Sequence, residues 1–221
     1  MKLMANAVIK FIAGIVMIGL ILFLPAGTIQ YPGAWLFMAL LFIPMFFLGV
    51  VLFLKAPELL AKRLNTREKE TEQKGVVAFS ALMFVGSFIL AGLDFRNQWS
   101  DIPAWLTVTA SIILLASYGL YAEVMRENAY LSRTVEVQEN QKVVDTGLYG
   151  IVRHPMYAAT IFLYLAMPLV LGSWVSFIVM LSYPVIIIFR IRNEEKVLEE
   201  GLEGYVEYKQ KVKYRLIPYV W

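Results

Sequence analysis

The 221-residue chain contains no cysteine and a single histidine, His154. The lack of cysteine excludes disulfides, thiolate metal sites and a cysteine nucleophile, and one histidine excludes a metal site built from several, so no metal is expected. Charged residues make up only 17% of the chain, whereas hydrophobic residues make up 59%. Soluble domains hold about 45–50% apolar and about 25% charged residues. The composition therefore indicates an integral membrane protein, and the modest net charge of +3 does not point to nucleic acid as a partner.

Six apolar runs predict helices that cross a lipid bilayer, which takes about 20 mostly apolar residues each. The runs cover residues 5–24, 34–54, 75–93, 103–125, 155–171 and 174–191. Only Gly172 and Ser173 separate the last two, so we expect these to form a helical hairpin. The sequence thus predicts an all-α, multi-pass integral membrane protein with about six transmembrane helices.

The basic residues predict the orientation of these helices. If both ends of the chain are cytoplasmic, every Lys and Arg except Arg96 falls on the cytoplasmic side. An excess of Lys and Arg is typical of cytoplasmic loops. The basic loop at 55–74 is expected to be a solvated connector.

Polar side chains interrupt the apolar pattern in two places, both on the predicted cytoplasmic side. The first lies between the fourth and fifth spans, with an extended stretch at 134–137, a turn at 145–147, and Pro155 in the first turn of the fifth span. The second continues the sixth span and places Arg190 and Glu194 four residues apart on one helix face.

The tail beyond the sixth span predicts an amphipathic C-terminal helix. Function in a membrane protein tends to lie where polar groups break the apolar pattern. We therefore expect a four-span scaffold over residues 1–125 and a polar pocket on the cytoplasmic side within residues 126–221, in one continuous domain.

Each of these polar residues also has a simpler interpretation. Arg190 is also explained as an anchor at the membrane surface, and Glu194 as its ion-pair partner. His154 suits a helix start, and Tyr149 and Tyr157 suit a membrane interface. The residues alone thus predict a polar pocket and leave its reaction open.

Several motifs within residues 130–221 resemble the isoprenylcysteine carboxyl methyltransferase family, part of a wider group of membrane methyltransferases that includes phospholipid N-methyltransferases. They are Gly147-Leu-Tyr149, Arg153-His154-Pro155-Met-Tyr157, Arg190 with Glu194-Glu195-x-x-Leu198, and Tyr205-x-x-Tyr208. The first four spans match only in being apolar. The chain has Ala159 where many members have glycine, and its methyl group is expected to narrow the pocket slightly.

The resemblance implies S-adenosylmethionine as cofactor, with S-adenosylhomocysteine as product, in a cytoplasmic cofactor pocket covered by the C-terminal segment. It thereby implies that residues 126–221 are the catalytic part. It implies that Glu194 holds the ammonium end of the cofactor and that Arg190 faces the carboxylate of the acceptor, as the two catalytic residues. The cofactor-binding residues that it implies are Glu136, Gln141, Lys142, Val143, Val144, Tyr149, His154, Pro155, Met156, Tyr157 and Glu194.

Methyl transfer to a carboxylate suits these residue types, because the carboxylate is already ionised at neutral pH and needs no general base. The enzyme has only to align donor and acceptor and exclude water. The expected acceptor is a prenylcysteine-type carboxylate, whose lipid tail would lie in the bilayer.

Three alternatives remain open from the sequence. In the first alternative, the methyl acceptor is a phospholipid amine or a small hydrophobic acid. The segment Tyr214-Arg-Leu-Ile-Pro-Tyr219 is similar to sterol reductases, which bind a nicotinamide dinucleotide but are longer and carry Gly-Asp where this chain has Ala159-Thr160. A non-enzymatic protein such as a small transporter is disfavoured, because transport pathways usually need polar groups at mid-depth, which the predicted spans almost lack.

Overall fold

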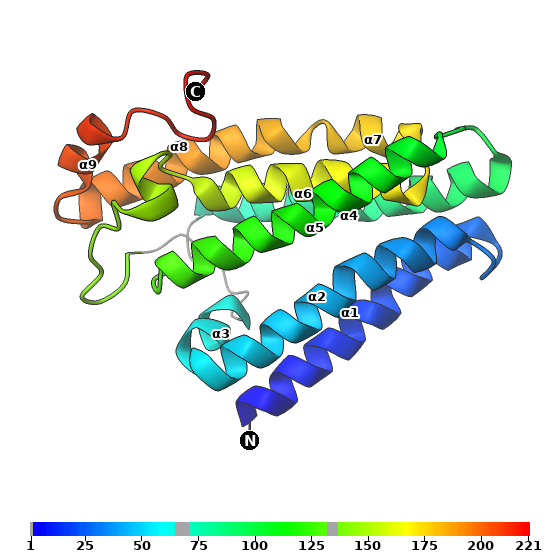
Figure 1. Cartoon of the computed structure of the whole chain (residues 1–221), viewed down its shortest axis with the longest axis horizontal. Coiled ribbons are helices and arrows are strands. Elements are labelled where there is room, and N and C mark those ends of the chain that lie inside the picture. The colour runs from blue at the N-terminus through cyan, green and yellow to red at the C-terminus, as the bar shows by residue number, and fades with distance from the viewer. Residues whose placement is uncertain (1, 65–70, 132–136) are drawn as a thin grey trace.

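The computed structural model describes residues 2–64, 71–131 and 137–221, and within these ranges the chain is helical and contains no strand. The prediction of an all-α protein is therefore confirmed. The helices are α1 Lys2–Ala26, α2 Pro32–Lys55, α3 Pro57–Leu64, α4 Thr71–Asn97, α5 Ala104–Glu127, the 3₁₀ helix η1 Gly147–Gly150, α6 Pro155–Leu171, α7 Trp174–Met180, α8 Tyr183–Gly201 and α9 Tyr205–Lys211 (Figure 1).

The long helices agree with the predicted multi-pass membrane protein. Five helical segments are long and apolar enough to span a bilayer: Leu3–Ala26, Pro32–Lys55, Gly75–Asn97, Ala104–Glu127 and Trp174–Gly201. The remaining predicted span is α6, a shorter apolar helix of 17 residues. Because no water reaches the hydrocarbon core, a helix that bonds all its own backbone groups is favoured there.

The last two spans form the expected hairpin. Gly172 ends α6 in the left-handed region with φ of 82°, and the Ser173 hydroxyl caps α7 by accepting a hydrogen bond from the Ser176 amide at 3.0 Å. The sixth span is interrupted between α7 and α8, just before Pro184. Proline is tolerated there because it lies in the first turn of α8, where its missing N–H has no helical partner.

Two segments that the sequence predicts to be cytoplasmic differ from their predicted structures. The expectation that residues 55–74 form only a solvated connector is wrong for α3, because Leu59 and Leu60 are buried there. Apolar burial thus folds part of this basic segment into a helix. The amphipathic tail is divided between the last turns of α8 and the separate helix α9, with a turn at Gly204, whose φ is 83°.

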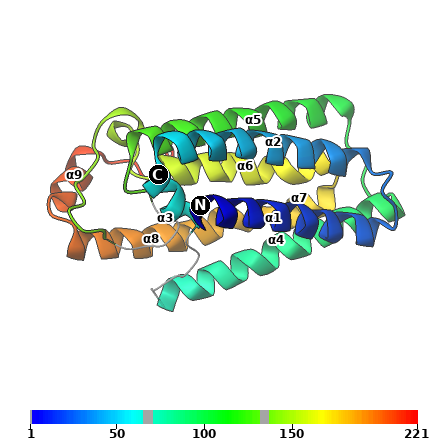
Figure 2. The same cartoon turned by 90° about the horizontal axis from the view of Figure 1, so that it is seen from below.

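The connections between the helices gather at two opposite ends of the bundle. The tight connections α1–α2, α4–α5 and α6–α7 lie at one end, and α3, η1 and α9 lie at the other (Figures 1 and 2). The main core contains residues from both the predicted scaffold and the predicted catalytic part, including Leu22, Phe37, Leu114, Leu163 and Ile187. A hydrogen bond also connects the two parts, because the Tyr31 hydroxyl donates to the Leu171 carbonyl at the end of α6, at 2.6 Å.

Close packing of α1 against α4 depends on Gly92. A Cβ at this position would lie 2.6 Å from the Leu22 carbonyl oxygen, which belongs to the α1 backbone. We expect Gly92→Ala to destabilise the protein by about 1–3 kcal/mol, because the helices must move apart. Gly86→Ala in the same helix is the matched control, since nothing lies within 4 Å of its Cβ position.

Thermal unfolding in detergent measures both effects. The expected result is a lower melting temperature for Gly92→Ala and an unchanged or higher one for Gly86→Ala, because alanine favours helices. Equal melting temperatures for the two variants would contradict the role of Gly92.

Candidate functional site

A cavity lies at the end of the bundle where η1, α9 and the start of α6 meet the last turns of α8. Its walls come from the α5–α6 connection, η1, α6, α8 and α9. The lining residues are Asn128, Tyr130, Leu131, Gln141, Lys142, Val143, Val144, Tyr149, Arg153, His154, Met156, Tyr157, Glu194, Leu198, Leu202, Tyr205 and Tyr208.

Most of the residues singled out in the sequence lie at this cavity. Every predicted cofactor residue lines it except Glu136, which lies outside the described residues, and Pro155, which is buried in the first turn of α6. Arg190 does not line the cavity but contacts Tyr157, which does. Ala159, expected to narrow the pocket, is fully buried in α6 and is not among the lining residues.

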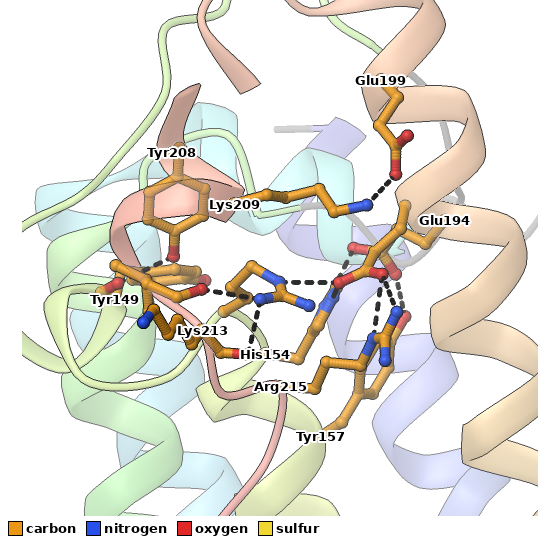
Figure 3. A network of polar contacts seen from close by, with 12 residues as sticks. Tyr149, His154, Tyr157, Glu194, Glu199, Tyr208, Lys209, Lys213 and Arg215 are labelled. Atoms are coloured by element: carbon orange, nitrogen blue, oxygen red, sulfur yellow. Dashed lines mark hydrogen bonds and ion pairs between the residues drawn. The ribbon is translucent and has the colours of Figure 1, made fainter. Parts of the chain in front are cut away.

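A chain of hydrogen bonds joins α6 and α8 at one wall of the cavity. The Arg190 Nε donates to the Tyr157 hydroxyl at 2.9 Å, and this hydroxyl donates to the Glu194 carboxylate. The His154 ring stacks on Tyr157 with the ring centres 5.7 Å apart, and its Nδ1 lies 3.9 Å from a Glu194 oxygen (Figure 3). These hydrogen bonds fix the positions of the Arg190 guanidinium, the Tyr157 phenol and the Glu194 carboxylate relative to one another.

The start of α6 is fixed by the C-terminal tail. The amides of Arg153 and His154 donate to the carbonyls of Tyr214 and Arg215, both at 2.9 Å. Because Pro155 occupies the first helical position, the helix begins directly after these bonds. The tail therefore covers this end of the helix and sets the positions of His154 and Tyr157.

A second polar network surrounds Glu195, whose carboxylate is only 3% exposed. One oxygen accepts from the Arg153 Nε at 2.8 Å and lies 3.4 Å from the His154 Nε2, and the other accepts from Arg215 at 2.9 Å. Arg153 also donates to two backbone carbonyls of the tail. A buried charge is tolerated when its bonds are satisfied in this way.

This network was not predicted from the sequence. In the sequence, Arg153 and Glu195 belong to the motifs that resemble the methyltransferase family, and Arg215 belongs to the segment that is similar to sterol reductases. One local signal indicates separate surroundings for the two carboxylates, because adjacent residues of a helix point about 100° apart.

Tyrosines form the remaining polar wall. The Tyr208 hydroxyl donates to the Tyr149 carbonyl at 2.7 Å, and the Asn128 side chain donates to the Tyr149 hydroxyl at 3.0 Å. Burial raises the pKa of Tyr149, Tyr205 and Tyr208 above the usual range, so these phenols stay protonated. Among the described residues the buried Tyr205 hydroxyl has no hydrogen-bond partner, which leaves a donor at the cavity wall.

Comparison with solved structures identifies the class of fold. The structure of a eukaryotic intramembrane Ras methyltransferase, isoprenylcysteine carboxyl methyltransferase, matches 92% of this chain and 74% of its own, with a TM-score of 0.56 and 18% sequence identity. The chain therefore has the fold of an intramembrane methyltransferase. The model of the isoprenylcysteine carboxyl methyltransferase family matches residues 108–200, which confirms the resemblance to this family.

Two curated proteins are also similar in sequence. Uncharacterized protein YpbQ of Bacillus subtilis (strain 168) is 25% identical over 164 residues, which are 69% of this chain and 95% of that protein. Delta(14)-sterol reductase TM7SF2 of Mus musculus is 29% identical over 91 residues, 40% of this chain. This match spans only 22% of the reductase.

The buried Glu195 network generates a stability prediction. We expect Glu195→Ala to destabilise the protein by about 3–5 kcal/mol, because Arg153 would remain buried without its counter-charge. Glu123→Ala is the matched control, because Glu123 pairs with Arg126 on an exposed helix surface, where the loss of an ion pair has little effect on stability. Denaturant unfolding of both variants measures the difference, and similar values would show that the network does not stabilise the fold.

Proposed function

We propose that this protein is a membrane methyltransferase that uses S-adenosylmethionine to methylate the carboxylate of a lipid-like acceptor of the prenylcysteine type. The ordered chain Arg190, Tyr157 and Glu194 at the cavity wall is the observation that carries the proposal. It provides a cation for the acceptor and an anion for the cofactor, one helical turn apart on α8. The family match and the methyltransferase fold support the same reaction class.

The residues of the cavity fit the proposed cofactor. Glu194, with a side chain 24% exposed, offers a carboxylate to an ammonium group. Val143, Val144 and Met156 offer apolar surface, and the Tyr205 hydroxyl offers a donor without a partner among the described residues. When bound, S-adenosylmethionine supplies an electrophilic methyl group.

Arg190 is proposed to orient the acceptor. A guanidinium binds both oxygens of a carboxylate in a fixed geometry, which restricts the approach of the nucleophilic oxygen. Its Nε is held by Tyr157, so the guanidinium plane is set before the acceptor arrives. Alignment of this kind accounts for a large part of the rate in transfer reactions.

The tail is proposed to exclude water from the reaction. Residues 214–215 lie against the start of α6, and α9 contributes Tyr205 and Tyr208 to the cavity. The positive-inside rule favours a cytoplasmic position for this end of the bundle and for both chain termini. We propose that residues 1–125 serve as the scaffold and residues 126–221 as the catalytic part of one continuous domain.

A second candidate is a reductase that uses a nicotinamide dinucleotide, which the match to part of a sterol reductase favours. Ligand-induced thermal stabilisation of the detergent-purified protein distinguishes the two. We expect S-adenosylhomocysteine to raise the melting temperature in a saturable manner, because a ligand that binds only the folded state stabilises it, and reduced nicotinamide dinucleotide phosphate to have no effect. The reverse pattern would establish the reductase, and no shift with either ligand would contradict both functions.

Two variants separate the proposed roles of the α8 residues. We expect Glu194→Gln to weaken S-adenosylhomocysteine binding about tenfold or more, because it removes a charged partner. Arg190→Ala is expected to leave this binding within a few-fold and to reduce methyl transfer to S-farnesyl-N-acetylcysteine by about 100-fold or more. Calorimetry and transfer of a radiolabelled methyl group give the two readouts.

Lys55→Gln is the control for both variants, because Lys55 at the end of α2 is exposed and does not line the cavity. Its binding and activity should equal those of the unmodified protein. Full activity of Arg190→Ala would remove Arg190 from the acceptor site. Unchanged ligand binding by Glu194→Gln would remove Glu194 from the cofactor site.

A further inference from the structure

Two adjoining hollows lie between α4 and α8, with cavity volumes of about 470 and 550 Å³. Both are bordered by Val76 and Phe189, so they form one continuous surface, which we term the α4–α8 groove. In Figure 2, α4 diverges from α8 toward the beginning of α4, on the side where the groove lies.

The groove changes from apolar to cationic along its length. Its apolar part is lined mainly by Val76, Phe79, Val185, Ile186 and Phe189. These residues lie within the segments Gly75–Asn97 and Trp174–Gly201, which are apolar enough to span a membrane. This part therefore faces a hydrocarbon environment.

The other part of the groove carries the polar groups Arg192, Asn193 and Lys196. Arg192 and Lys196 are exposed, and within the described parts of the chain neither forms an ion pair. The side-chain nitrogen of Asn193 is buried and has no hydrogen-bond partner among the described residues. A buried donor without an acceptor is costly, and an oxygen of a molecule bound in the groove would satisfy it.

The groove is separate from the candidate site. Successive residues of a helix point about 100° apart, so Glu194 and Leu198, which line the site, lie roughly 140° and 180° around α8 from Phe189. Asn193 and Lys196 lie within roughly 40° of Phe189. A molecule in the groove is thus on the opposite face of α8 from the methyl-transfer chemistry.

We propose that the α4–α8 groove binds an anionic phospholipid of the surrounding leaflet. One acyl chain lies along Phe79, Val185 and Phe189, and the phosphate lies between Arg192 and Lys196. A phosphate or ester oxygen accepts the hydrogen bond from Asn193. Basic sites between transmembrane helices at the membrane surface bind anionic lipid head groups in this manner, and a zwitterionic lipid lacks the net charge to match two cations.

The test is thermal unfolding of the full chain, delipidated in a neutral detergent, with added dioleoyl phosphatidylglycerol or dioleoyl phosphatidylcholine. The expected result is a saturable rise in melting temperature of roughly 2–4 °C with phosphatidylglycerol and a clearly smaller rise with phosphatidylcholine. Equal shifts with the two lipids would overturn the proposal. An equal shift with soluble glycerol 3-phosphate would show that a free phosphate suffices and would overturn the lipid as occupant.

Two variants locate the effect in the groove. Arg192→Gln/Lys196→Gln should lower the apparent affinity for phosphatidylglycerol about tenfold or more by removing both counter-charges. Val185→Trp should abolish the lipid-specific shift by filling the apolar part, and it is expected to fold because Val185 is 53% exposed.

The double variant Lys55→Gln/Lys213→Gln is the matched control, since it removes the same charge from exposed residues that do not line the groove. It should respond to phosphatidylglycerol as the unmodified protein does. An equal loss in this control would assign the effect to surface charge in general, and a full response of Val185→Trp would show that no acyl chain occupies the groove. Either result would overturn the proposal.

Discussion

The buried carboxylate of Glu195 is the interaction on which the arrangement of the site depends. It joins three parts of the chain that are distant in sequence: α8, the residue before the start of α6, and the C-terminal tail. Because Glu195 and Arg153 are almost fully buried, removal of either would leave the other charge buried without its partner. In the same arrangement, carbonyls of the tail backbone accept hydrogen bonds from the amides of Arg153 and His154.

The position of the remaining site residues follows from this pairing. With Glu195 directed toward the tail, the helical geometry of α8 directs Glu194 toward the cavity. Pro155 begins α6 directly after His154, which brings Tyr157 one turn into the helix and into contact with both Arg190 and Glu194. A polar cavity is thus built at the end of a bundle whose core is otherwise apolar.

Helix α8 serves different environments on its different faces. One face contributes Glu194 and Leu198 to the cavity, and the opposite face contributes Phe189 and Lys196 to the groove beside α4. In our proposals, the two faces of α8 bind different molecules. An anionic phospholipid binds the groove face, and the face that lines the cavity stays available for the acceptor.

The sequence by itself determined the membrane class, the helical fold and the approximate spans, because these depend on long apolar runs, which are a local property. Local pattern also indicated a polar pocket, through Pro155 as a helix start and the four-residue spacing of Arg190 and Glu194. Most individual residues of the candidate site came from the resemblance of the motifs to a known family. Only the tertiary structure decided that α3 folds, that the tail pairs with the start of α6, and that Glu195 meets Arg153 and Arg215. These features depend on contacts between residues far apart in the chain, which neither helical periodicity nor composition specifies.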